Sequence, residues 1–224
     1  VEPALLFAGT EFGLYVSLDG GATWSRWSRG FPAVSTMDLA IQPREGDLVV
    51  GTFGRSIWIL DDLQPWRALA RDPAIADESL HLFAPADAYQ VVMDQVRGQR
   101  LSPDQLYAGD NNAREALISF WVGDPATGSV TVAVEQGGER LREWEVPVQP
   151  GLNRTSWDLQ LDGYAIYGPL MSPDLEMPLA PPGRYDVVVE TGSELRRAAL
   201  QLRPDPRVDS DPGVYAANLS YRRA

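Results

Sequence analysis

An internal repeat constrains the fold of this chain more than any other feature. When the sequence is shifted by 42 positions, five residues of the first copy meet identical residues in the second without a gap: Leu6, Gly9, Thr10, Asp19 and Trp24 fall on Leu48, Gly51, Thr52, Asp61 and Trp66. The apolar residues of both copies are spaced as in strands, whereas helical repeats space them at about 3.6 residues. The repeat therefore predicts two successive copies of one small β-sheet.

Six short strands are expected within the repeat. They are predicted over 5–10, 14–18 and 23–28 in the first copy and over 36–42, 47–52 and 56–60 in the second. An outer strand is expected over 80–92, after a loop through Pro65 and Pro73. A period of about 40 to 45 residues with short strands is typical of a β-propeller blade. About two blades are predicted, and because two blades cannot close a ring, the upstream blades of a longer precursor are the expected partner.

An alternative remains open at this point. Two similar hairpins also arise by chance in a small independent β-sandwich, although the aligned Gly-Thr and Trp positions argue against it.

The segment from Ser17 to Trp24 combines turn-forming residues with an aromatic residue. It matches the Asp-box pattern Ser-X-Asp-X-Gly-X-Thr-Trp at every defined position, namely Ser17, Asp19, Gly21, Thr23 and Trp24. In such a turn an Asp side chain accepts backbone N–H groups and Gly permits positive φ. The Trp24 ring is expected to be buried over the base of the hairpin. The second copy keeps Asp61 and Trp66 but has lost the Gly and Thr, and is interpreted as a degenerate last repeat.

These segments resemble the final blades of large bacterial Asp-box (BNR) repeat proteins, which are similar to sortilin-type and sialidase-type propellers. The resemblance covers residues 5–92. It implies an exported protein, extracellular or periplasmic, whose blades are followed by an immunoglobulin-like domain. In the sialidases and other glycoside hydrolases of this kind the Asp-boxes lie away from the catalytic face, so the motif alone does not imply catalysis.

The second half of the chain predicts a separate β domain. Alternating runs occur at 116–122, 129–135, 139–148, 152–159, 184–190 and 195–203. Six strands in about ninety residues are typical of an immunoglobulin-like sandwich. The expected division is 1–96 for the blades, 97–115 for a polar linker, 116–204 for the sandwich and 205–224 for a C-terminal tail. The predicted fold class is all-β, with the last blades of an Asp-box propeller preceding the sandwich.

Charge and composition disfavour several classes of partner. Asp and Glu number 31 against 19 basic residues, and the net charge of −12 repels nucleic acid and anionic lipid. There is no Cys, and no run approaches the roughly 20 apolar residues that span a bilayer. We expect no nucleic-acid partner and no membrane span.

Few side chains are candidates for a chemical site, and no catalytic, cofactor or metal-binding residue is predicted. His81 is the only histidine and has no Cys or second His with which to share zinc. Asp61 and Asp62 are candidates for binding a cation or a sugar hydroxyl, but a turn after a strand also favours Asp for structural reasons. An apolar loop forms a candidate contact surface, or folds back onto the protein, through Tyr164, Tyr167 and Met171.

The leading functional hypothesis is a non-enzymatic exported scaffold or interaction module with a protein or glycan ligand. One rival is the accessory C-terminal region of a sialidase-like glycoside hydrolase whose catalytic residues lie upstream. The other is a self-assembling extracellular structural protein.

Overall fold

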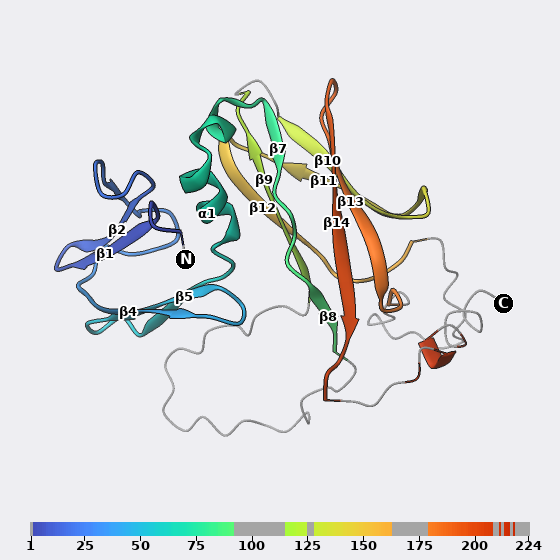
Figure 1. Cartoon of the computed structure of the whole chain (residues 1–224), viewed down its shortest axis with the longest axis horizontal. Coiled ribbons are helices and arrows are strands. Elements are labelled where there is room, and N and C mark those ends of the chain that lie inside the picture. The colour runs from blue at the N-terminus through green and yellow to red at the C-terminus, as the bar shows by residue number, and fades with distance from the viewer. Residues whose placement is uncertain are drawn as a thin grey trace, which may run out of the picture. The chain divides into compact units, whose positions relative to one another are not determined.

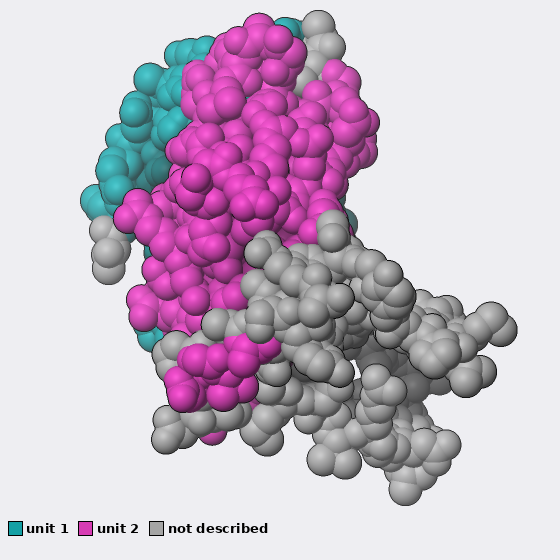
Figure 2. All heavy atoms as spheres, turned by 90° about the vertical axis from the view of Figure 1, so that its right-hand side faces the viewer, with its two compact units in different colours: residues 1–83, 120–125, 150–152 teal, residues 84–119, 126–149, 153–224 magenta. Residues whose placement is uncertain are grey.

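The fold is described from a computed structural model, which describes residues 2–91, 115–124, 128–162, 179–207, 211, 213–215 and 217. Two compact units are distinguished (Figure 2): unit 1 contains residues 1–83, 120–125 and 150–152, and unit 2 contains residues 84–119, 126–149 and 153–224. Strands make up most of the regular structure (Figure 1). The predicted all-β class is confirmed.

The first copy of the repeat forms an antiparallel sheet in the order β1-β2-β3. Its strands are β1 (Leu6–Thr10), β2 (Gly13–Ser17) and β3 (Ser25–Arg26). A two-residue turn joins β1 to β2 and pairs Thr10 with Gly13. The prediction of a strand over 23–28 is wrong in its extent, because Thr23 and Trp24 belong to the preceding turn.

The second copy forms a sheet in the order β4-β5-β6. Its strands are β4 (Thr36–Gln42), β5 (Asp47–Thr52) and β6 (Ile57–Leu60), close to the predicted ranges. The two sheets share one apolar core. It contains buried Leu14, Leu48, Val50 and Leu63, and the partly buried side chains packed on them are Phe7, Trp27, Phe31, Leu39, Trp58, Leu60 and Trp66.

A helix follows the second sheet where a loop is predicted. The helix α1 (Gln64–Arg71) is followed by the 3-10 helix η1 (Pro73–Asp77). Pro65 lies in the first turn of α1, where its missing N–H costs nothing, and the Asp62 side chain accepts the Gln64 N–H at 2.9 Å. Leu69 of α1 and Ile75 of η1 form a second small core with Phe83. The prediction of a loop through Pro65 and Pro73 is wrong, because proline is tolerated in the first turn of a helix and each of the two lies there.

The outer strand predicted over 80–92 does not form. The segment contains two three-residue strands instead, β7 (Leu80–Leu82) and β8 (Ala88–Gln90). Neither belongs to the β4-β5-β6 sheet, because β7 pairs with β9 (Ala116–Val122) and β8 pairs in parallel with β14 (Leu195–Pro204). Pro85 lies between them and has no N–H for a continuous ladder.

Unit 2 is built on a five-stranded sheet in the order β11-β10-β13-β14-β8. Its remaining strands are β10 (Ser129–Gln136), β11 (Glu139–Pro147) and β13 (Gly183–Glu190). A tight turn joins β10 to β11: Gln136 pairs with Glu139, and the two glycines between them have φ of 61° and 86°. A further three-stranded sheet has the order β12-β9-β7, in which β12 spans Gly151–Trp157.

The core of unit 2 includes both faces of β13. Tyr185, Val187 and Val189 share one face and are all buried, and Val188 on the other face is buried as well. The Tyr185 ring meets Trp157 edge-on at 5.3 Å between centroids, and the Tyr185 hydroxyl donates to the Pro181 carbonyl oxygen at 2.6 Å. This pair of aromatic side chains anchors β13 inside the unit.

Candidate interaction surface

The Asp-box segment forms a closed turn held by its own side chains. The Ser17 hydroxyl donates to Asp19 Oδ1 at 2.7 Å and accepts the Gly21 N–H at 2.8 Å. Asp19 also accepts the Thr23 N–H at 2.9 Å and the Thr23 hydroxyl at 2.5 Å. Gly20 and Gly21 have φ of 71° and 96°, which non-glycine residues rarely adopt. The defined polar positions of the motif are therefore used to build the turn itself.

These bonds also determine the charge state of Asp19. The Thr23 hydroxyl, then the Thr23 N–H and the Ser17 hydroxyl, lower the pKa of Asp19 from 3.8 to about 2. A carboxylate that stays ionised and donates no proton is suited to holding the turn. It is poorly suited to acid catalysis near neutral pH.

The expected burial of Trp24 is wrong. Its side chain is 44% exposed, and its indole Nε1–H donates to the Gly21 carbonyl oxygen at 3.1 Å. That bond holds the ring against the surface of the turn rather than in the core. The buried position in the turn belongs to Ser17, which accepts and donates at its centre.

The degenerate copy of the motif has a different structure. Asp61 ends the second sheet, and its neighbour Asp62 has a φ of 48° and donates its N–H to Asp47 Oδ1 at 2.9 Å. Trp66 lies on α1, with its ring 4.7 Å from that of Trp27 between centroids. Leu63 and Pro65 occupy the positions of Gly21 and Thr23, so the segment continues into a helix.

The close approach of the two sheets depends on Gly9. A Cβ placed on Gly9 would lie 2.7 Å from Thr36 Cγ2 and 2.9 Å from the Thr36 carbonyl oxygen. The β4 strand therefore crosses the face of β1 at a distance that only glycine allows. This face of the first sheet also carries Phe7 and Leu14, which pack in the core that the two sheets share, and the buried Val16.

The second sheet has one covered face and one open face. Its covered face carries Leu48 and Val50. Register places eight residues together on the other side, which we name the open face: Asp38, Ala40, Gln42, Asp47, Val49, Gly51, Ile57 and Ile59. Ile57 is 66% exposed and Ile59 is 61% exposed. Two exposed β-branched apolar side chains on one sheet face make the open face a candidate interaction surface.

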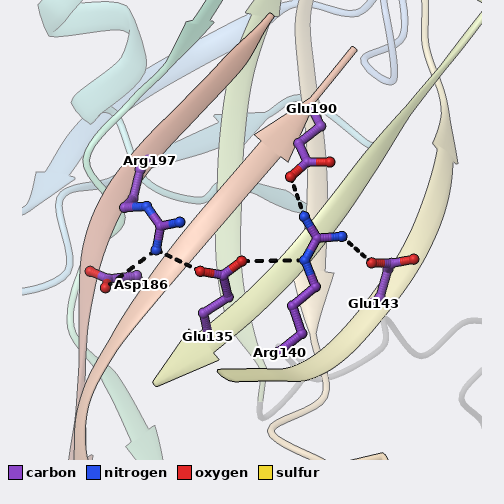
Figure 3. A network of polar contacts seen from close by, with 6 residues as sticks. All are labelled: Glu135, Arg140, Glu143, Asp186, Glu190 and Arg197. Carbon is purple, nitrogen blue, oxygen red and sulfur yellow. Dashed lines mark hydrogen bonds and ion pairs between the residues drawn. The ribbon is translucent and has the colours of Figure 1, made fainter. Parts of the chain in front are cut away.

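Six charged side chains on the described strands of unit 2 form one network of ion pairs (Figure 3). The Glu135 side chain, 7% exposed, binds Arg197 at 2.6 Å and Arg140 at 3.3 Å, and Arg140 also contacts Glu143 and Glu190. Burial raises the pKa of Glu135, but the bonds from Arg197 and Arg140 outweigh it and leave this pKa below its ordinary value. The network connects β10, β11, β13 and β14, and its role is structural.

The described residues hold few features of a chemical site. His81 Nδ1 lies 3.1 Å from Glu78 Oε1, and within the described ranges no group of three or more His, Asp or Glu side chains could hold a metal ion. No helix among the described residues is long and apolar enough to cross a bilayer. Tyr164, Tyr167 and Met171, the predicted contact surface, lie outside the described residues.

Sequence reasoning missed the open face, although a signal for it is present. Residues 57–60 read Ile-Trp-Ile-Leu, with no polar position in the strand. An uninterrupted apolar strand is expected to be covered on both sides. The open face is the side of this strand that the described chain leaves uncovered.

Comparison with known proteins adds no family assignment. No protein-family model matches the chain, and a search of curated proteins found no similar sequence.

Proposed function

We propose that this chain is a non-enzymatic, exported scaffold or interaction module that forms the C-terminal part of a larger Asp-box propeller. The observation that carries the proposal is the open face of the second sheet. The corresponding face of the first sheet is covered by the next sheet in the chain, so the fold already contains one example of the contact that the open face lacks.

The correspondence between the two faces follows from the repeat and the strand register. The shift of 42 residues places Phe7 on Val49 and Gly9 on Gly51. Phe7 pairs with Val16 and Val49 pairs with Ile59, so Ile59 takes the position of Val16. In the same way, Gly9 pairs with Leu14 and Gly51 pairs with Ile57, so Ile57 takes the position of Leu14.

Corresponding residues differ sharply in exposure. Leu14 and Val16 are 2% and 8% exposed, against 66% and 61% for Ile57 and Ile59. Gly51 provides the same freedom for close approach as Gly9, because the nearest atom to a Cβ placed there is Asp38 Cβ at 3.6 Å, within its own sheet. The open face is therefore suited to a further sheet of the same repeat, with a β-branched residue crossing Gly51 as Thr36 crosses Gly9.

A contact of this kind is directional. One face of each sheet meets the opposite face of the next, so each added repeat presents a new open face. Such a series ends when it closes into a ring, as in the proposed propeller. It continues without limit if it does not close, which describes the self-assembling structural protein that is the second candidate.

Native mass spectrometry of the protein isolated from its own cells, beside its denatured intact mass, tests the proposal. We expect the chain to be joined to, or tightly bound to, polypeptide that contains further repeats. A series of masses at multiples of this chain alone would favour self-assembly. A lone monomer in which Ile59→Asp changes neither solubility nor the state of association would contradict both forms.

A further inference from the structure

The outer edge of β1 differs from the same edge in the second sheet. In the β1-β2-β3 order, β1 is an edge strand, and no strand among the described residues pairs with it on the side away from β2. The corresponding strand β5 is central, because β4 pairs with it on that side. The first sheet therefore lacks the strand that β4 supplies in the second.

Register identifies the backbone groups that this edge presents. The Leu14 carbonyl oxygen accepts the Trp27 N–H at 2.8 Å, so the backbone groups of Leu14 are directed toward β3. Gly9 lies opposite Leu14, and in an antiparallel ladder such a pair is not hydrogen-bonded, so the N–H and C=O of Gly9 point away from β2. Because backbone groups reverse direction at each residue along a strand, the N–H and C=O of Phe7, two residues before Gly9, also point away from β2.

The second sheet shows how such groups are satisfied. The Thr52 N–H donates to the Ser56 carbonyl oxygen at 3.3 Å, so Thr52 is directed toward the β6 side. Its neighbour Gly51 is then directed toward β4, and alternation gives the same direction for Val49. Gly51 and Val49 are the counterparts of Gly9 and Phe7. The backbone N–H and C=O groups at these two positions therefore face β4 in the second sheet and the unpaired edge in the first.

We propose that the outer edge of β1 binds an extended strand of a further repeat by antiparallel β-strand addition. The inference rests on the proposed function and names the element by which a neighbouring repeat joins. The incoming strand has the alternation of β4, and its register follows from β4 on β5: the position of Asp38 lies opposite Gly9 and the position of Ala40 lies opposite Phe7. Main-chain hydrogen bonds supply the affinity and alternate side chains the specificity.

A synthetic peptide with the sequence of Ser35–Gln42, added to the full-length chain, is a direct probe. Amide hydrogen exchange followed by NMR should show slower exchange at Phe7 and Gly9, whose N–H groups become bonded. The amides of Leu6 and Ala8 already face β2 and serve as internal controls, since their exchange should change less.

Two N-methylated peptides form a matched pair of the same composition. Methylation at the Asp38 and Ala40 positions blocks the N–H groups that face β1, and should weaken binding by about tenfold or more. Methylation at Leu39 and Ile41 blocks groups that face away, and should change the affinity by about threefold at most.

Three results would overturn strand addition at β1. The two methylated peptides could lose affinity equally, the slower amide exchange could be confined to β4–β6, or the unmodified peptide could fail to bind up to its solubility limit. The proposed function is tested separately, because association through the open face depends on Ile57 and Ile59. If Ile59→Asp abolishes association but still binds the peptide normally, both the proposed function and the strand site at β1 stand. If the wild-type chain associates but does not bind the peptide, only the strand site at β1 is overturned.

Discussion

The two sheets of unit 1 come from one repeat and differ mainly in their neighbours. Phe7 and Leu14 pack in the core shared with the second sheet and Val16 is buried, whereas the corresponding Val49, Ile57 and Ile59 lie on an open face. On the strand edge the difference is reversed, because β5 is paired on both sides and β1 on one. The comparison teaches that burial in a repeat is set by the adjacent copy rather than by the residue itself. Substitutions at corresponding positions should therefore have unequal effects.

The pair Leu48 and Leu6 should show the largest difference. Leu48→Ala removes a fully buried side chain and leaves a cavity, which should lower the free energy of unfolding by about 2–5 kcal/mol. Leu6→Ala acts on a side chain that is already partly in water, and should cost about 1 kcal/mol or less. Urea unfolding of the two variants checks this. Equal losses would mean that the two positions are equally buried in solution.

The two glycines give a purely steric comparison. Gly9→Ala places a Cβ against the backbone of Thr36 and should cost about 1–3 kcal/mol. Gly51→Ala meets only ordinary contacts, and should be neutral or stabilise by up to about 1 kcal/mol by restricting the unfolded chain. Thermal unfolding of both variants in parallel is sufficient. A loss at Gly51 as large as that at Gly9 would show that a sheet already lies over the open face.

Local patterns predicted the strands of both copies because alternation and turn residues act over a few positions. The ranges 36–42 and 47–52 agree with β4 and β5. The helix α1 was missed although Asp62, Pro65 and the spacing of Trp66, Leu69 and Ala70 are helix signals. The alignment of Trp66 with Trp24 favoured a second turn at that point.

Long-range pairing was beyond sequence reasoning. Nothing local to residues 80–92 indicates that β7 pairs with β9 and β8 with β14, since strand partners are chosen by the whole fold. The Asp-box positions could be predicted as a turn from spacing alone. The exposure of Trp24 could not, because it depends on what lies above the turn.

Two tryptophans with equivalent hydrogen bonds separate a surface ring from a core ring. Each indole N–H donates to a carbonyl oxygen three residues earlier, Trp24 to Gly21 and Trp58 to Arg55. Trp58→Ala also removes an edge-on contact with Phe31 in the shared core, and should cost about 2–4 kcal/mol. Trp24→Ala should cost about 1 kcal/mol. Chemical denaturation measures both free energies of unfolding. A decrease above about 3 kcal/mol for Trp24→Ala would show that the Trp24 ring is buried in solution.

The smallest expected effect concerns the ionised Asp19 of the first turn, whose partner Thr23 is replaced by Pro65 in the second copy. The pKa of Asp19 is about 2 in the folded chain and 3.8 as an ordinary carboxyl, so its ionisation favours the folded state. This contribution is complete above the unfolded value and is lost as the pH falls through the interval toward the folded value. Asp19→Asn keeps an oxygen for the Thr23 N–H but cannot accept the Thr23 hydroxyl through its amide nitrogen. The stability difference between wild type and variant should thus be constant near neutral pH and shrink below about pH 4. A difference that does not change with pH would assign the turn's stability to its hydrogen-bond geometry instead of to the charge of Asp19.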